Sequence, residues 1–139
     1  KDEEKAPDTI NHVGEQWKVI SGDYNLVDVT IGGGFKQGSA ANIGSFYLNG
    51  GTGSFDLNFD GIHKEDVFSY TEDNGSISII SVSQNVGSGA NVSQSVIAMN
   101  GEMTATTIEL NGTVVKQATT GSSAGTFTLS LTDLVLEKQ

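Results

Sequence analysis

The sequence contains no cysteine and no arginine, and it has a single proline among its 139 residues. Without cysteine, the chain forms no disulfide, carries no thiol nucleophile and offers no thiolate ligand to zinc. Without arginine, it cannot bind a carboxylate or phosphate through a planar guanidinium fork. All seven basic residues are lysines, against 17 acidic residues, which gives a formal net charge of −10. Such a chain repels nucleic acid, so we expect no nucleic-acid partner.

Long apolar runs are also missing, since none approaches the roughly 20 residues of a membrane-spanning helix. Glycine, by contrast, is abundant at 18 residues, and high glycine with little proline is typical of many tight turns. The length suits one domain with a sizeable core. We expect residues 1–9 to form a disordered tether, because they are charged and lack large apolar side chains. Residues 10–139 would then form the single domain.

Turn signals divide the rest of the chain into short segments. Asx-Gly pairs tolerate the positive φ angles that tight hairpin turns require. The segments between them are rich in β-branched and aromatic residues, and several alternate apolar with polar positions, as half-buried strands do. The pattern predicts an all-β domain of about eight to ten antiparallel strands. The five dipeptides are Asn49-Gly50, Asp60-Gly61, Asn74-Gly75, Asn100-Gly101 and Asn111-Gly112.

The predicted strands include one long bent strand and a hairpin around Asn100-Gly101. We expect bulges at Gly22-Asp23 and at Thr132-Asp133, where the apolar parity of the last strand shifts. The predicted strands cover residues 17–31, 43–48, 54–60, 65–71, 76–82, 92–99, 103–110, 113–116 and 126–138. The small-residue segments expected to form loops at the mouth of the domain are Gly32–Asn42, Gln84–Asn91 and Thr119–Gly125.

Three segments together resemble the lipocalin-like domains of bacterial lipoproteins. They are the opening Gly14–Val19, the central stretch Phe55–Ile79 with its Phe-Asp-Leu-Asn-Phe-Asp-Gly run, and the closing Leu129–Glu137. The resemblance implies an up-and-down barrel of about eight strands, closed at its bottom by Trp17. The chain departs from the lipocalin pattern at two points. Two residues separate Gly14 from Trp17, where one is usual, and no arginine exists to pack over that tryptophan.

The first four residues, Lys-Asp-Glu-Glu, resemble the start of surface lipoproteins of certain Gram-negative bacteria, although an ordinary acidic tail would look the same. In those proteins the run follows a lipidated cysteine, which this chain does not contain. The resemblance implies an outer-membrane or cell-surface lipoprotein, periplasmic or extracellular, that touches the membrane only through this N-terminal anchor. We further expect a monomer.

Fold and resemblance together suggest a non-enzymatic binding domain that needs no cofactor. A barrel of this size either fills with side chains or holds one small ligand, here an apolar or amphipathic molecule in a cavity of roughly 300 Å³ or more. The alternative fold is a two-sheet β-sandwich acting as an adhesion or glycan-binding module without an internal ligand. The residues expected to line the barrel interior, or simply to pack its core, are Trp17, Phe55, Leu57, Phe59, Phe68 and Tyr70.

Other motifs in the chain carry little chemistry. Asp56–Gly61 matches half of a calcium loop, but Val67 stands where the bidentate glutamate belongs, so a strand and turn are expected instead. Gly121–Gly125 fits G-x-S-x-G, yet no histidine follows residue 63 to complete a triad. The spacing of the two histidines, His12 and His63, predicts no metal site. A weak surface calcium site remains as an alternative, and its ligands would come from Asp56, Asp60, Glu65 or Asp66.

Overall fold

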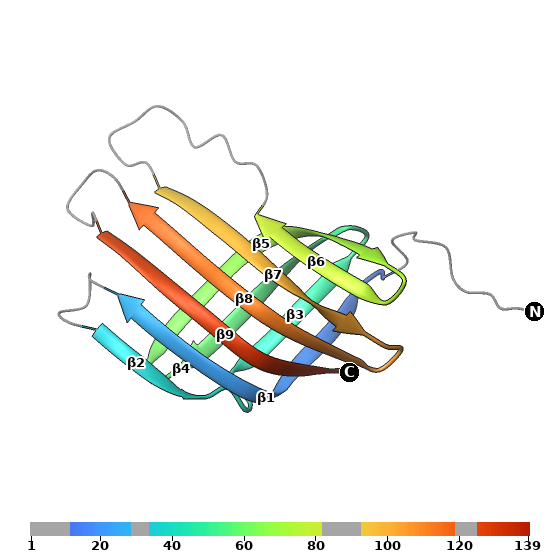
Figure 1. The fold of residues 1–139 in the computed structure, drawn as a ribbon, viewed down its shortest axis with the longest axis horizontal. Coiled ribbons are helices and arrows are strands. Elements are labelled where there is room, and N and C mark those ends of the chain that lie inside the picture. Colours follow the sequence, from blue (N-terminus) through green and yellow to red (C-terminus); the bar gives the residue numbers. More distant parts are fainter. Residues whose placement is uncertain (1–11, 29–33, 82–92, 119–124) are drawn as a thin grey trace, which may run out of the picture.

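The computed structural model describes residues 12–28, 34–81, 93–118 and 125–139, which form nine antiparallel strands and no helix (Figure 1). The predicted tether, residues 1–9, lies outside the described residues. The strands are β1 (Glu15–Asp28), β2 (Gly34–Ser39), β3 (Gly44–Asn49), β4 (Thr52–Phe59), β5 (Ile62–Asp73), β6 (Ser76–Ser81), β7 (Ser93–Met103), β8 (Thr107–Ala118) and β9 (Gly125–Lys138).

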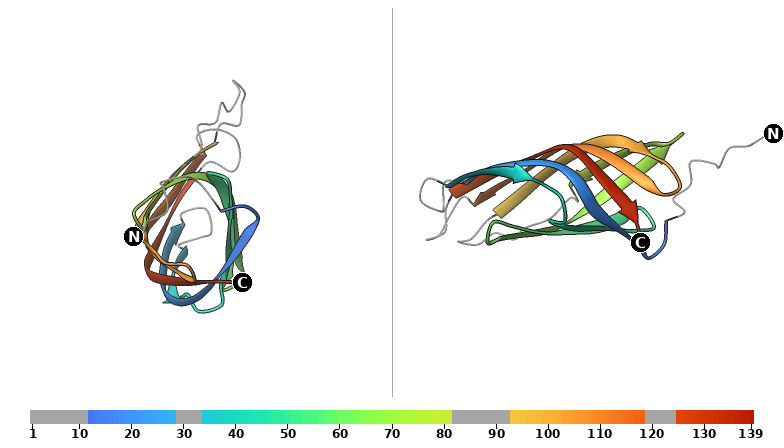
Figure 2. Two further views of the ribbon diagram at one scale, coloured as in Figure 1. Left: turned by 90° about the vertical axis from the view of Figure 1, so that its right-hand side faces the viewer. Right: turned by 90° about the horizontal axis from the view of Figure 1, so that it is seen from below.

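Eight of these strands form a closed barrel. The hydrogen-bonded order runs β1-β3-β4-β5-β6-β7-β8-β9, and β9 pairs back onto β1 along its length, from Trp17 opposite Lys138 to Asp28 opposite Phe127. Figure 2 shows the strands curving round on themselves. The remaining strand, β2, forms a hairpin with the second half of β1. The predicted up-and-down barrel is therefore confirmed, since neighbours in sequence pair in turn and the first strand closes onto the last.

The bend of β1 lies at the predicted bulge. The first half of β1 pairs with β3 and the second half with β2, and its register with β9 shifts between Val19 and Asp23. Gly22 has a φ of +122°, and a side-chain carbon there would lie 2.8 Å from the backbone oxygen of Asp133. Only glycine fits this close approach. Asp133 itself has a φ of +53°, and the irregular pairing beside it confirms the second predicted bulge.

Three Asx-Gly dipeptides lie at hairpin turns, as predicted. Asp60 and Asn74 have φ angles of 53° and 55°, and the glycines that follow them have 77° and 84°, which is the geometry of the two-residue turns that match strand twist. The turn after Asn49 is made by Gly50 and Gly51.

The hairpin predicted around Asn100-Gly101 is wrong, because this dipeptide and Asn111-Gly112 lie inside β7 and β8. The two asparagines pair with each other across the strands. A side-chain carbon on Gly101 would fall 1.6 Å from the Glu109 backbone oxygen. The glycine therefore permits a close backbone approach within the sheet rather than a turn. The real turn lies at residues 104–106, where Thr104 Oγ1 accepts hydrogen bonds from the backbone N–H groups of Thr106 and Thr107 at 3.2 and 3.0 Å.

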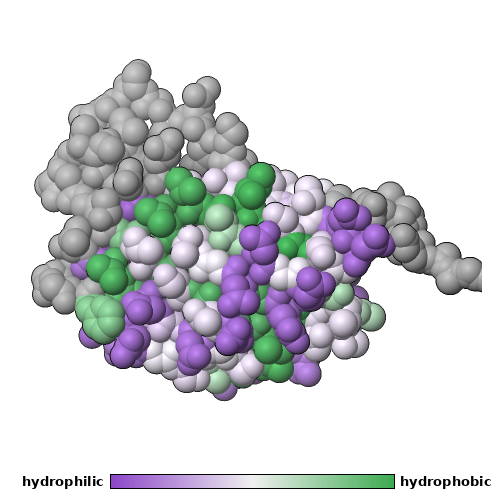
Figure 3. Space-filling model, in the orientation of Figure 1, coloured by the Kyte–Doolittle hydropathy of each residue, from purple (hydrophilic) through white to green (hydrophobic). Residues whose placement is uncertain are grey.

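Strand β2 corrects a second prediction, since it occupies most of the expected loop Gly32–Asn42. Its glycines lower its intrinsic strand preference, but pairing with β1 supplies the hydrogen bonds. Phe35 faces outward opposite Val27, and the two side chains are 56% and 48% exposed. Apolar side chains gather on this face toward the end of the barrel where β1 finishes (Figure 3). We call this end the Asp28 end, and the opposite one the Trp17 end.

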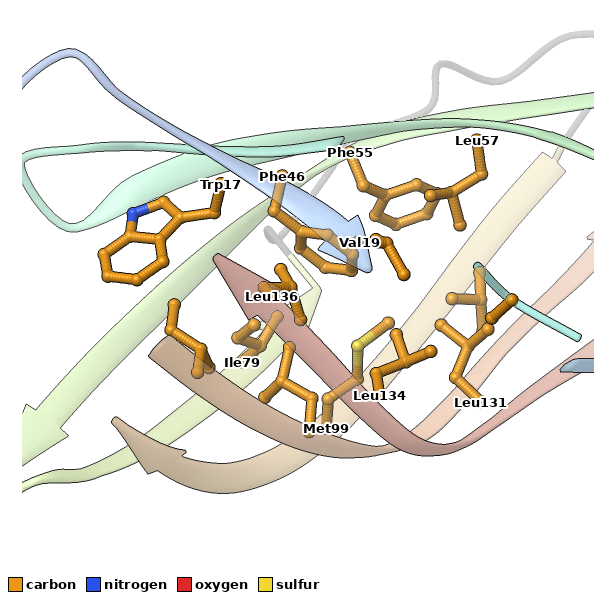
Figure 4. Close-up of a cluster of buried hydrophobic side chains, with 14 of the residues drawn as sticks. Trp17, Val19, Phe46, Phe55, Leu57, Ile79, Met99, Leu131, Leu134 and Leu136 are labelled. Carbon is orange, nitrogen blue, oxygen red and sulfur yellow. The ribbon is translucent and has the colours of Figure 1, made fainter. Parts of the chain in front are cut away.

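Inward positions of the barrel carry the core. Phe46, Phe55 and Phe68 form an aromatic cluster with ring centroids 5.7 to 6.5 Å apart. Figure 4 shows Phe46 and Phe55 on one side of the interior and Leu134 and Met99 on the other. Each large buried side chain contributes roughly 1.5–3 kcal/mol to stability, so this interior is the main source of stability.

Candidate functional site

The six predicted interior residues all point into the barrel and are buried. Their exposed fractions range from 0% for Leu57 and Phe68 to 5% for Phe59. The ring of Phe68 packs against the rings of both Phe55 and Tyr70. The ring centroids of Phe59 and Tyr24 lie 4.4 Å apart. They therefore belong to a packed core. The six are Trp17, Phe55, Leu57, Phe59, Phe68 and Tyr70.

The Trp17 end of the barrel is closed by a polar network around His12. The two ring nitrogens of His12 lie 2.8 Å from a Glu15 carboxylate oxygen and 2.7 Å from a Glu72 carboxylate oxygen. The indole N–H of Trp17 donates to the same Glu15 oxygen at 3.1 Å. The Tyr70 hydroxyl donates to the His12 backbone carbonyl at 3.5 Å. These contacts hold the segment before β1 across this end of the core.

Tyr70 titrates abnormally in this network. Burial is the main cause of its raised pKa, and a hydrogen bond from the Gly51 backbone acts in the opposite direction. The negative charges of Glu15 and Glu72 raise the pKa further. The phenol therefore stays protonated at neutral pH and serves as a hydrogen-bond donor, so we assign it a structural role.

The Asp28 end carries a pocket of about 300 Å³. Among the described residues, Ser81 at the end of β6 pairs with Phe68, and residues 62–67 of β5 pair only with β4. Its apolar lining comes from Phe55, Val114 and Phe127. The polar lining combines Lys64, Lys116, Asp66, Glu65 and His63.

Three of these polar residues project from inward positions. Asp66 lies opposite the inward Phe55, and Lys64 lies opposite the inward Leu57. Lys116 lies opposite Phe127, which packs against the core. Residues directly opposite each other in a sheet share a face, so these charged groups border the interior rather than the outer surface.

Lys64 is held by a buried carboxylate. Its ammonium lies 3.4 Å from Oδ2 of Asp28, which is 3% exposed, and 3.9 Å from the centroid of the Phe127 ring. The ion pair links β5 to β1 across the interior. The cation over the ring adds an attraction of about 0.5–2 kcal/mol, depending on how far the site is desolvated.

The sequence interpretation missed these charges because it followed the period-two pattern of β5 only through Phe68 and Tyr70. Extending the same parity backwards gives Asp66, Lys64 and Ile62 as inward positions, so the signal was present. Asp66 lies opposite the inward Phe55 and lines the pocket with it, whereas Asp56 is exposed beside His63.

The outward side of the β4–β5 hairpin carries the other candidate groups. His63 Nε2 lies 2.8 Å from Asp56 Oδ1 and 3.9 Å from Glu65 Oε1, and all three side chains are exposed. Asp60 lies in the tight turn instead of a calcium loop, and it pairs with Lys36 at 3.4 Å. The two histidines lie in separate networks.

Two of the expected mouth loops fall mostly outside the description of the structure. Residues 84–91 and 119–124 are not among the described residues, and the G-x-S-x-G segment lies there except for Gly125, which begins β9. Among the described residues, no helix is long and apolar enough to cross a membrane.

No protein-family model, curated protein or solved structure matches this chain. The lipocalin resemblance remains a prediction. The geometry of the site is therefore the basis for the inference about ligand binding.

Proposed function

We propose that this protein is a non-enzymatic cell-envelope lipoprotein domain that binds a small apolar or amphipathic molecule at the Asp28 end of its barrel. The observation that carries the proposal is the pocket of about 300 Å³ beside Phe55, Val114 and Phe127. Ligand sites of proteins combine an apolar lining with a few polar groups, and their volumes start near about 300 Å³. This pocket has both features.

The arrangement of the barrel favours entry at the Asp28 end. At the Trp17 end, His12 and its carboxylate partners lie across the core. At the Asp28 end, the interior carries charged groups that a sealed core would exclude, because burying a charge is costly unless it serves a partner or ligand. We therefore place the ligand between β5 and the β8–β9 pair rather than at the barrel centre.

The lipoprotein part of the proposal rests on the sequence. The Lys-Asp-Glu-Glu run and the charged residues around it have the composition of a surface tether, which supports a protein outside the cytoplasm. The exposed cluster of Asp56, His63 and Glu65 gives little support to an enzyme, since catalytic groups are usually desolvated in a cleft.

Native mass spectrometry tests the binding function. The protein is incubated with a total lipid extract from a Gram-negative bacterium, desalted and weighed. We expect a bound mass that Phe127→Ser abolishes, since Phe127 lines the pocket, and that Phe35→Ser retains, since Phe35 lies on the outer surface. Circular dichroism confirms that both variants fold. A folded wild-type protein without any bound mass would contradict the proposal.

A second candidate function is glycan binding or adhesion on the outer surface. A groove of about 560 Å³ crosses β5 to β8, and most of its lining residues have polar side chains, three of them acidic. Thr71, Ser78, Asn100 and Asn111 form one cross-strand row of hydroxyl and amide groups in it. Such groups hydrogen-bond sugar hydroxyls. A glycan array separates the two functions: retention of glycans that Asn100→Ala abolishes would favour this candidate.

A further inference from the structure

The charges around the pocket are unevenly partnered. Lys64 is paired with Asp28, and Glu65 lies beside His63 on the outward side. The Asp66 carboxylate accepts a hydrogen bond from the backbone N–H of Val67 at 2.9 Å. Lys116 differs from these groups, because no ion pair or hydrogen bond joins its ammonium to any of the residues that the structure describes.

The position of Lys116 suits it for binding a ligand. It lies on β8 with Ser95 opposite on β7 and Phe127 opposite on β9. It is half-buried, and the apolar Val114 precedes it on the same face. An ammonium group here stands at the edge of an apolar surface, where long lysine side chains pack their stems and present their charged ends.

We propose that the ligand of this pocket carries an anionic head group, which Lys116 binds, on an apolar body that contacts Val114, Phe127 and Phe55. This inference rests on the proposed binding function and specifies the ligand's charge. A pocket of about 300 Å³ has the volume of roughly ten water molecules at about 30 Å³ each. An eight-carbon chain with a small head group fits that volume.

The chemistry of lysine sets how selective the head-group contact is. Its ammonium is a compact charge with three donors, whereas a guanidinium fork would favour planar two-point partners. Carboxylate, sulfate and phosphate heads therefore share the chemistry that Lys116 recognises. Asp66 lines the same pocket and repels each of them, so it limits the affinity.

Three probes with the same apolar chain test the charge: octanoate, 1-octanol and octylammonium. Each is titrated into the folded protein while backbone amide shifts are followed by NMR, with octyl sulfate as a second anion. We expect shifts around Val114 and Phe127, and octanoate binding about fivefold tighter than 1-octanol, the upper range for an ion pair at a partly exposed site. Octyl sulfate should behave like octanoate.

Variants assign the effect to one residue. Lys116→Gln should reduce octanoate affinity to that of 1-octanol, while Lys18→Gln, an exposed lysine on β1, should leave it unchanged. Asp66→Asn should strengthen octanoate binding. If 1-octanol binds as tightly as octanoate and Lys116→Gln has no effect, the anionic head group is wrong although the binding function stands. Tighter binding of octylammonium, lost in Asp66→Asn, would reverse the assigned charge. If no probe shifts the pocket amides, both proposals fail.

Discussion

The ammonium of Lys64 on β5 reaches across the barrel to the carboxylate of Asp28 on β1, at 3.4 Å. The two residues are 36 positions apart in sequence and stand on strands that do not pair with each other. Asp28 is 3% exposed, so its charge requires a partner in the interior. The ion pair therefore ties the β4–β5 hairpin to the opposite side of the barrel beside the pocket.

Removing the cation should destabilise the protein more than removing the pair. Lys64→Met leaves the Asp28 charge without this partner, and we expect the free energy of unfolding to fall by about 3 kcal/mol. The double variant Asp28→Asn, Lys64→Met should lose less free energy of unfolding than Lys64→Met alone, because it leaves no buried charge at this pair. Urea denaturation measures both. Lys138→Met is the matched control, since Lys138 forms its ion pair with Glu15 while 41% exposed, and should change stability by under about 1 kcal/mol.

Two glycines allow the cost of a close backbone approach to be measured. Gly101→Ala would place a carbon 1.6 Å from the Glu109 backbone oxygen, so β7 and β8 must separate locally. At Gly50, no atom lies within 4 Å, and alanine meets only the strain of a φ of +65°. We expect Gly50→Ala to cost about 1 kcal/mol and Gly101→Ala clearly more. Thermal unfolding of the two variants compares them, and equal losses would contradict the in-strand role of Gly101.

The fold was predictable where the signal is local. The alternation of Phe55, Leu57 and Phe59 gave β4, and Gly22 marked the bend of β1. The turn predicted at Asn100-Gly101 was wrong because a dipeptide indicates a local turn preference but not which strand pairs with it. Here, pairing with β8 overrides that local preference. The site was less predictable for the same reason. Asp28 and Lys116 come close to β5 only through the pairing register of the closed barrel. The sequence pattern of a single strand does not specify that register.

Alkaline pH should weaken the fold through Tyr70. Its pKa is raised chiefly by burial, while that of an unfolded tyrosine is about 10. Above about pH 10 the unfolded chain therefore releases this proton first, and the free energy of unfolding falls as pH rises through the folded-state pKa. Below pH 10 the stabilisation is fully present. Urea denaturation at about pH 8 to about pH 11 measures this change, because the range includes the pKa of an unfolded tyrosine. The free energy of unfolding should decline less steeply with pH for Tyr70→Phe than for the wild type. Parallel declines would contradict this assignment.

The two histidines offer a matched test of the closed end of the barrel. Both pair with carboxylates at 2.7 to 2.8 Å, but His12 is 18% exposed between Glu15 and Glu72, and His63 is 49% exposed beside Asp56. Since solvent screens exposed pairs, we expect His63→Ala to change the free energy of unfolding by under about 0.5 kcal/mol and His12→Ala to lower it by about 1–2 kcal/mol.

A local measurement separates loss of the closed end from general destabilisation. The ring of His12 lies 6.4 Å from that of Trp17, whose indole N–H donates to the same Glu15 carboxylate that His12 contacts. In His12→Ala this indole proton should therefore exchange with solvent faster, while amides at the Asp28 end of β9 keep their protection. Faster exchange at both ends alike would indicate a global loss of stability and would contradict a local role for His12. In the His63→Ala control, the Trp17 indole proton should exchange at the wild-type rate.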